Sequence, residues 1–276
     1  MSKSPEEILV VGATGSIGRL VVTEAIREGY VVRALVRDPN RAQGLPPLVQ
    51  RVVGDLTRPE TLVAAVDGVD AIVFTHGSDG SGRLGAEAVD YGGVRNVLAA
   101  LGNRKVRIAL MSAIGVTHRT GAYNRSTEAH DWKRRGERLV RASGLPYTIV
   151  RPGWFDYNGP DQHRLKMLQG DTRKAGDPSD GVVARSQIAE TLVRSLASDA
   201  ARGKTFELVA ERGHAPKDFD SLFAPLEADT PGALDAIRDT PNMPLDQEPE
   251  RVREAMRQLA ACELFNATRT NRSNRT

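Results

Sequence analysis

The sequence predicts an α/β protein with a doubly wound, parallel sheet of about seven strands and a C-terminal covering segment. Three observations support this fold class. Short apolar runs typical of strands alternate with segments of helical periodicity. A glycine-rich turn joins the first strand to the first helix. Beyond Arg151 the alternation weakens and prolines become frequent, which favours a chain that wraps over a surface.

The first elements are the clearest. Ile8–Val11 is a continuous apolar run, typical of a strand that is covered on both faces. Ser16–Glu28 carries its apolar residues on one stripe, which predicts a helix. Thr57 and Glu60 have the spacing of a capping box, so a further helix is expected to start there and to end at Gly68.

The remaining elements follow from the same two periodicities. Further strands are expected at Tyr30–Val36, Gln50–Val53, Ala71–Thr75, Val106–Met111, Tyr147–Val150 and Thr205–Val209. Further helices are expected at Gly85–Leu101, Thr127–Ser143, Ser186–Ser198 and Glu250–Leu264. Because helices separate successive strands, the strands should pair in parallel, and a ligand should bind at their carboxyl ends.

This pattern predicts one domain over residues 1–264, with a core at 8–154 and a substrate-covering part at 155–264. Residues 265–276 are predicted to be a disordered tail. The formal net charge of +3 is accounted for by three tail arginines, so the body is neutral. We therefore expect no nucleic-acid partner.

Composition narrows the class further. Hydrophobic residues make up 40% and charged residues 26%, which excludes collagen and wholesale disorder. The single cysteine, Cys262, cannot form an internal disulfide, and this favours a cytoplasmic location. No apolar stretch has the length of a membrane span, and Met1–Glu7 does not resemble a secretion signal. We expect no membrane partner and no metal site.

The turn after the first strand has the pattern Gly-x-x-Gly-x-x-Gly. Gly12 is expected to make the tight turn, Gly15 to permit close approach of a diphosphate, and Gly18 to let the helix pack on the strand. The amides of Ser16 and Ile17 are the expected phosphate donors. This context indicates a Rossmann-type dinucleotide site, with a ligand-free βα turn as the alternative.

The residues after the second strand indicate the type of cofactor. Arg37 stands where an NAD site has a carboxylate, and a guanidinium can bind a 2′-phosphate through two hydrogen bonds. NADP(H) is therefore favoured over NAD(H). Arg37 as a solvated surface residue is the alternative, and Asp38 is a second candidate for a ribose hydroxyl.

Two further strand ends supply candidate cofactor contacts. After the third strand, Asp55 is expected to accept from the adenine amino group and Leu56 to contact the ring, or Asp55 only caps the turn. After the fourth strand, Thr75 and Gly77 are expected beside the cofactor. His76 either lines the same site or is an ordinary loop histidine.

Several motifs occur in a fixed order: Gly12-Ala13-Thr14-Gly15-Ser16-Ile17-Gly18, Val36–Pro39, Gly54–Leu56, Ser112, Lys133 and Ser143–Gly153. Together they resemble the atypical short-chain dehydrogenase/reductases, the NAD(P)H-binding group that includes NmrA-like regulators and flavin or biliverdin reductases. The resemblance covers about residues 8–154 and is weaker beyond Phe155. It implies a seven-stranded parallel sheet, a cofactor across the strand ends, and a monomer or homodimer.

Most alcohol-oxidising or carbonyl-reducing members carry Tyr-x-x-x-Lys, in which the lysine lowers the pKa of a tyrosine on the same helix face. Lys133 matches the lysine, but Ala129 occupies the tyrosine position. The proton transfer that this tyrosine provides in other members therefore cannot run in the usual way here. Lys133 is still expected to hold the nicotinamide ribose, with an exposed pair to Glu137 as the alternative.

Other residues are candidates for the missing proton donor. Ser112 follows the fifth strand, His130 lies three residues before Lys133, and Tyr123 lies on the loop before that helix. Pro152 and Trp154, with Phe155 beyond them, are expected to flank the nicotinamide. The two aromatic residues either form an apolar wall for a planar substrate or belong to the core.

The favoured function is an NADPH-dependent oxidoreductase that transfers hydride to a small planar acceptor: a quinone, a flavin or a conjugated carbonyl. Such acceptors need little general-acid help, because delocalisation spreads the arriving charge. A non-catalytic NADP(H) sensor that binds a partner protein is the first alternative. A sugar-nucleotide epimerase or dehydratase is the second, and the missing tyrosine counts against it.

Overall fold

The computed structural model describes residues 6–78 and 80–260. Eight strands form the central sheet in the order β3-β2-β1-β4-β5-β6-β10-β8. Its parallel strands are β1 Glu7–Val11, β2 Val31–Val36, β3 Gln50–Val53, β4 Ala71–Phe74, β5 Arg107–Met111, β6 Tyr147–Pro152 and β10 Lys204–Glu211. These seven coincide with the seven predicted strands, so the predicted fold class is confirmed.

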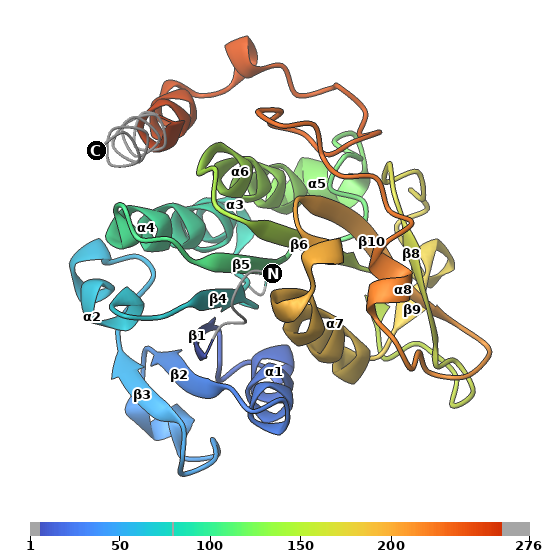
Figure 1. Cartoon of the computed structure of the whole chain (residues 1–276). Coiled ribbons are helices and arrows are strands. Elements are labelled where there is room, and N and C mark those ends of the chain that lie inside the picture. The colour runs from blue at the N-terminus through green and yellow to red at the C-terminus, as the bar shows by residue number, and fades with distance from the viewer. Residues whose placement is uncertain (1–5, 79, 261–276) are drawn as a thin grey trace, which may run out of the picture.

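Helices cover both faces of this sheet (Figure 1). They are α1 Ser16–Arg27, α2 Val63–Val66, α3 Gly82–Gly85, α4 Gly92–Leu101, α5 Ala122–Thr127, α6 Ala129–Ala142, α7 Arg185–Ala197 and α8 Asp220–Phe223. Residues 250–260 are also helical, and the expected end of that helix at Leu264 lies outside the described residues, as does the predicted tail.

The apolar run of β1 explains why both faces are covered. Ile8 and Val10 belong to the core that α1 and α7 close, whereas Leu9 and Val11 belong to the core beneath α2, α4 and α6. Successive side chains of a strand point to opposite faces, so a strand buried on both sides needs apolar residues at every position.

The capping-box prediction was wrong. The Thr57 hydroxyl and amide both donate to Oδ1 of Asp55 at 2.8 Å. A 3₁₀ turn, Pro59–Thr61, and the short α2 follow. Asp55, rather than a threonine cap, accepts the hydrogen bonds at the beginning of this turn. The helix expected to start at Thr57 is therefore reduced to the short α2.

One predicted helix is divided. The run Gly85–Leu101 consists of the last residue of α3, a π-helical segment at Ala86–Tyr91, and α4. Helical periodicity extends through this break, which is why the sequence predicts a single helix. The helix predicted at Thr127–Ser143 is α6, and Glu128, in a left-handed conformation (φ 55°), separates it from α5.

Three strands were missed by the sequence analysis. β8 Arg164–Leu168 pairs antiparallel with β10 at the edge of the sheet. β7 Trp154–Phe155 and β9 Val182–Val183 form a separate two-stranded parallel sheet. The two residues each of β7 and β9 are too few to show a periodicity, and β8 carries charges at an exposed edge.

Residues 227–249, here called the clasp, lie over the outer face of α6 (Figure 1). Four α6 arginines reach into the clasp: Arg134 and Arg138 bind Asp235, Arg135 binds Glu248, and Arg141 binds Asp229. These guanidiniums are buried, so each pair compensates a desolvated charge. The clasp is therefore tied to the domain by ion pairs.

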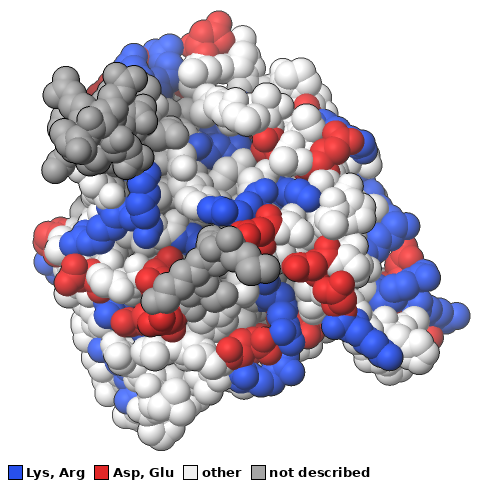
Figure 2. Space-filling model, in the orientation of Figure 1, with Lys and Arg blue, Asp and Glu red and all other residues white. Residues whose placement is uncertain are grey.

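On the face shown in Figure 2, basic and acidic side chains are interspersed, with no continuous basic surface. Among the described residues, no helix is long and apolar enough to cross a membrane. The cytoplasmic location inferred from the sequence remains a prediction.

Candidate functional site

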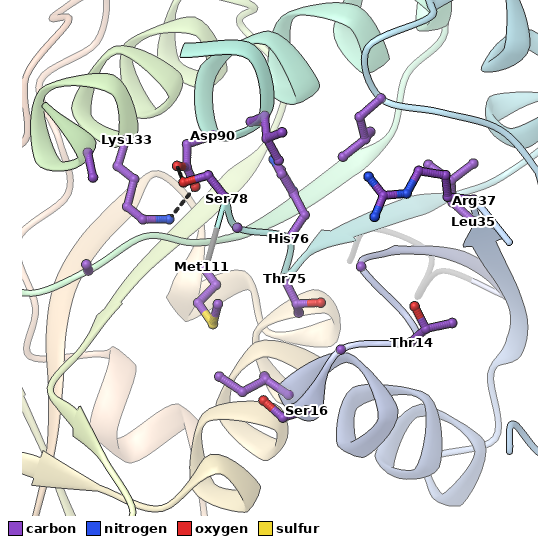
Figure 3. A pocket seen from close by; sticks show the side chains of 18 of the residues that line it. Thr14, Ser16, Leu35, Arg37, Thr75, His76, Ser78, Asp90, Met111 and Lys133 are labelled. Carbon is purple, nitrogen blue, oxygen red and sulfur yellow. Dashed lines mark hydrogen bonds and ion pairs between the residues drawn. The ribbon is translucent and has the colours of Figure 1, made fainter. Parts of the chain in front are cut away.

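A cavity of about 440 Å³ opens at the carboxyl ends of β1, β2, β4 and β5. Its volume is in the usual range of small-molecule sites. Arg37 lies at one end and Lys133 at the other, with Thr75 and His76 between them (Figure 3). The predicted residues that line it are Gly12, Thr14, Gly15, Ser16, Ile17, Arg37, Asp55, Leu56, Thr75, His76, Gly77, Ser112, Tyr123 and Lys133.

Four predicted site residues lie outside this lining. Gly18 is buried beneath the loop, His130 packs behind Tyr123, Pro152 ends β6, and Trp154 packs on Tyr157. Instead of Trp154, its neighbour Phe155 faces the cavity. The segment 155–264 was expected to cover the substrate, and among its described residues Phe155 lines this cavity. The covering role expected of that segment remains a prediction.

The glycine loop has the geometry of a cradle. Gly12 adopts φ +89°, and a Cβ on it would lie 2.7 Å from the His76 amide nitrogen. A Cβ on Gly18 would lie 2.0 Å from the carbonyl oxygen of Gly12, so helix and strand could not approach. α1 begins at Ser16, and the first amides of a helix have no partner within it. The loop therefore presents N–H groups to the cavity.

Two arginines line the end of the cavity beyond Thr14, and the sequence analysis named only one of them. Arg41 lines the wall together with Arg37. Asp38 does not line it: its Oδ1 accepts from the Asn40 amide at 2.9 Å and caps a 3₁₀ turn. Asp55 also lines this end, and its hydrogen bonds from Thr57 lower its pKa.

At the other end, Lys133 is held by an acid that the sequence analysis missed. Its Nζ lies 2.8 Å from Oδ1 of Asp90, which lies in the π-helical segment (Figure 3). The Ser78 hydroxyl donates to the other oxygen of Asp90 at 2.6 Å. The alternative pairing with Glu137 is wrong. The only sequence signal for Asp90 is an acid within an apolar helical run.

Glu137 is occupied elsewhere. Its carboxylate accepts from both Nε and Nη2 of Arg151, at 2.9 and 2.7 Å, and both side chains lie in the interior. Burial acts to raise the pKa of Glu137, but the Arg151 and Arg141 guanidiniums lower it to about 2. Glu137 is therefore an ionised part of the core, one helical turn from Lys133.

His76 is neutral at ordinary pH. It is buried, and burial lowers its pKa to about 4. Its Nε2 lies 3.1 Å from the carbonyl oxygen of Val89, an acceptor that fixes Nε2 as the protonated nitrogen. His76 lines the cavity without adding a positive charge to it.

Ser112 is the candidate proton donor that lies closest to the strand ends. It follows β5 and is only 3% exposed. Its hydroxyl makes no hydrogen bond of regular geometry among the described residues, although it contributes to lowering the pKa of Glu137. Tyr123 lines the cavity from α5, and Ala129 lines it at the usual tyrosine position. His130 packs on Tyr123 with ring centroids 5.1 Å apart, and burial lowers its pKa.

Phe155, which was expected to flank the nicotinamide, lines the cavity. Further lining residues were not predicted as site residues from the sequence: Leu35, Arg41, Gly54, Thr57, Ser78, Gly80, Val89, Asp90, Met111, Ala113 and Ala129. Five of them immediately flank predicted residues at strand ends, so a wider window around each strand end would have included Gly54, Thr57, Ser78, Met111 and Ala113.

The cavity fits a dinucleotide. The glycine loop, where an added Cβ would clash, matches the diphosphate. The two arginines of the lining match the adenosine half. The buried Ser112 hydroxyl, which makes no hydrogen bond of regular geometry among the described residues, matches the reactive half. A nucleotide with a 2′-phosphate adds two negative charges near the arginine pair, where a guanidinium can bind them.

Comparison with known proteins agrees with this geometry. A family model described as NAD(P)H-binding matches residues 12–199. The uncharacterized sugar epimerase YhfK of Bacillus subtilis (strain 168) is 30% identical over 207 residues, which cover 73% of this chain and 93% of that protein. Sanguinarine reductase of Eschscholzia californica is 26% identical over 260 residues, which cover 79% and 94%.

Among solved structures, a short-chain dehydrogenase/reductase (wide type) from Veillonella parvula DSM 2008 in complex with NADP has the same fold. Its TM-score is 0.57 at 16% identity, covering 78% of this chain and all of that one. The family match spans more than half of the chain and includes the glycine loop and the strand ends around the cavity. The chain therefore belongs to the NAD(P)H-binding oxidoreductases, in the atypical group of the short-chain dehydrogenase/reductases.

Proposed function

We propose that this protein is an NADPH-dependent oxidoreductase that transfers hydride to a small planar acceptor, such as a quinone, a flavin or a conjugated carbonyl. One observation carries the proposal: a single cavity connects the arginine pair Arg37 and Arg41, the glycine loop, and the Lys133 and Ser112 end. The relative named sanguinarine reductase supports a reductase activity.

The preference for NADP(H) rests on charge. Arg37 and Arg41 line the cavity, whereas Asp38 accepts from the Asn40 amide and is not part of the lining. Two guanidiniums favour a 2′-phosphate and offer no acceptor to the 2′-hydroxyl of NAD. Asp55 and Leu56 would contact the adenine.

At the other end, NADPH supplies a hydride from its nicotinamide ring when bound. Lys133 would hold the ribose hydroxyls with the donors that Asp90 leaves free, and Asp90 fixes its direction. The Ser112 hydroxyl would donate to an oxygen of the acceptor. Phe155, Met111 and Tyr123 supply the surface for a flat molecule.

The absence of a tyrosine at position 129 restricts the acceptor. Ala129 lines the cavity there and cannot transfer a proton. A conjugated acceptor spreads the arriving negative charge, so a hydrogen bond from Ser112 is sufficient help. An isolated ketone has no such delocalisation and would require the missing acid.

The test is NADPH oxidation by the purified protein, followed by the near-ultraviolet absorbance of the cofactor. We expect turnover with quinones or free flavins and none with simple ketones. Tight NADPH binding with no turnover of any acceptor would favour the alternative NADP(H)-sensing role. Turnover of a nucleotide sugar would favour the epimerase alternative, and no NADPH binding at all would refute the proposal.

A further inference from the structure

Arg185 links the C-terminal part of the chain to the glycine loop. It is the first residue of α7, which packs along α1. Its Nε donates to the Ser16 hydroxyl over 3.2 Å, although the two residues are 169 positions apart in sequence. Ser16 is the first residue of α1 and lines the cavity. The guanidinium therefore lies beside the loop that presents N–H groups.

Two other contacts hold this guanidinium in place. Asp156 forms an ion pair with Nη1, and its Oδ1 accepts from the Arg185 backbone amide at 3.0 Å. The guanidinium carbon lies 5.3 Å from the ring centre of Phe155, which lines the cavity. With its side chain 35% exposed, Arg185 lies at the rim between Phe155 and Ser16.

The charges of the cavity lining leave a role for this residue. Among the residues that the structure describes, the charged side chains that line it are Arg37, Arg41, Asp55, Asp90 and Lys133. Arg37 lies at the end of the cavity away from Lys133, Arg41 also lines the cavity, and Lys133 is neutralised by Asp90. The glycine loop between them contributes no formal charge, yet the diphosphate of a dinucleotide carries two negative charges.

We infer that Arg185, at the rim of the cavity beside the glycine loop, binds the diphosphate of the cofactor. This inference rests on the proposed NADPH-binding function. A guanidinium donates two parallel hydrogen bonds to phosphate oxygens, and Arg185 already reaches the residue whose amide faces them. Asp156 holds the Arg185 side chain in position in the free protein. When the nucleotide binds, Nη1 of Arg185 leaves Asp156 and donates to a phosphate oxygen.

A structural role for Arg185 makes a different prediction, and Asp156→Asn separates the two. Asp156 has φ +56°, a left-handed conformation that asparagine tolerates, and an amide oxygen can still accept from the Arg185 N–H. This variant removes the charge that competes for the guanidinium but keeps the backbone contact. Arg185→Ala removes the guanidinium itself.

The experiment is isothermal titration calorimetry of the full chain with three probes: NADPH, ADP-ribose, which has the diphosphate, and adenosine 2′-monophosphate, which lacks it. We expect Arg185→Ala to bind NADPH and ADP-ribose about ten-fold more weakly or worse, and adenosine 2′-monophosphate within about two-fold of the native protein. Arg37→Ala should weaken NADPH and adenosine 2′-monophosphate, which carry the 2′-phosphate, and should bind ADP-ribose within about two-fold of the native protein. Asp156→Asn should bind NADPH at least as tightly as the native protein.

Each result decides the question. If Arg185→Ala binds ADP-ribose as the native protein does, or if it weakens all three probes equally, the inference is wrong. If Asp156→Asn loses as much affinity as Arg185→Ala, the ion pair has a structural role and the inference is again wrong. If the native protein binds none of the probes, the proposed function fails first, and the inference fails with it. Thermal unfolding of each variant verifies that it is folded.

Discussion

The ammonium group of Lys133 lies 2.8 Å from a carboxylate oxygen of Asp90, and the two residues come from separate helical segments on one face of the sheet. The side chain of Asp90 is 1% exposed and that of Lys133 is 20% exposed. A buried carboxylate needs a compensating charge and hydrogen bonds, and here Lys133 and Ser78 provide both. The orientation of Lys133 toward the cavity is thus decided by Asp90.

The first prediction concerns this pair. Asp90→Asn and Lys133→Met should each lower the free energy of unfolding by about 1–3 kcal/mol, because each leaves a buried partner unsatisfied. The double variant should lose less than the sum, with a coupling of about 0.5–3 kcal/mol. Urea unfolding at neutral pH measures all three. The exposed pair Arg104 and Asp67 is the control, with an expected coupling below about 1 kcal/mol.

The second prediction concerns cofactor choice. Arg37→Ala should weaken NADPH binding by about 1.5–3 kcal/mol, the range for hydrogen bonds to a charged group, and should leave NADH binding unchanged. Calorimetric titration with both cofactors measures the difference. Arg58→Ala is the control, since Arg58 is exposed, pairs with Glu60 and comes after the neighbouring strand β3. Equal losses for NADPH and NADH would show that Arg37 does not contact the 2′-phosphate.

The third prediction concerns Ser112. Its buried hydroxyl makes no hydrogen bond of regular geometry among the described residues, so Ser112→Ala removes at most a weak interaction with the Glu137 carboxylate. We expect the free energy of unfolding to stay within about 0.5 kcal/mol of the native value or to rise. NADPH affinity should be nearly unchanged and kcat reduced. An unchanged kcat would remove Ser112 from the mechanism.

The fourth prediction concerns the pH dependence of stability. Burial raises the pKa of Glu207 to about 8. The nearby Arg151 acts to lower this pKa, and the negative charge of Asp171 acts to raise it. Its ordinary value is 4.5, so the folded chain holds this proton more tightly than the unfolded chain. The resulting stability is complete below about pH 4.5 and is lost as pH rises toward 8.

Glu207→Gln mimics the protonated side chain and should abolish this slope. We expect the variant to be more stable than the native protein at pH 9 and similar to it at pH 5, measured by urea unfolding. Glu211→Gln is the matched control on the same strand, because Glu211 is partly exposed and pairs with Lys166. If native and Glu207→Gln curves stay parallel across this range, Glu207 is ionised throughout.

Many residues of the cavity lining could be predicted from the sequence, because they lie at the ends of strands. Gly12, Arg37, Asp55, Thr75 and Ser112 each follow a predicted strand, and parallel strands bring their carboxyl ends to one edge. Residues that reach the cavity from the middle of a helix, such as Asp90, have no comparable local signal. Asp90 lies in a π-helical segment that the periodicity does not distinguish from an α-helix.

The sequence by itself determined the fold class, the seven parallel strands and the glycine loop, because these depend on local periodicity and on backbone conformations that neighbouring residues specify. Tertiary structure alone decided which charges meet: Lys133 with Asp90, Arg185 with Asp156, and the α6 arginines with the clasp. Such pairs join segments that are distant in the chain, and any of 38 basic residues could by sequence meet any of 35 acidic ones. Only packing, which buries some of these charges and forces them to find partners, selects among them.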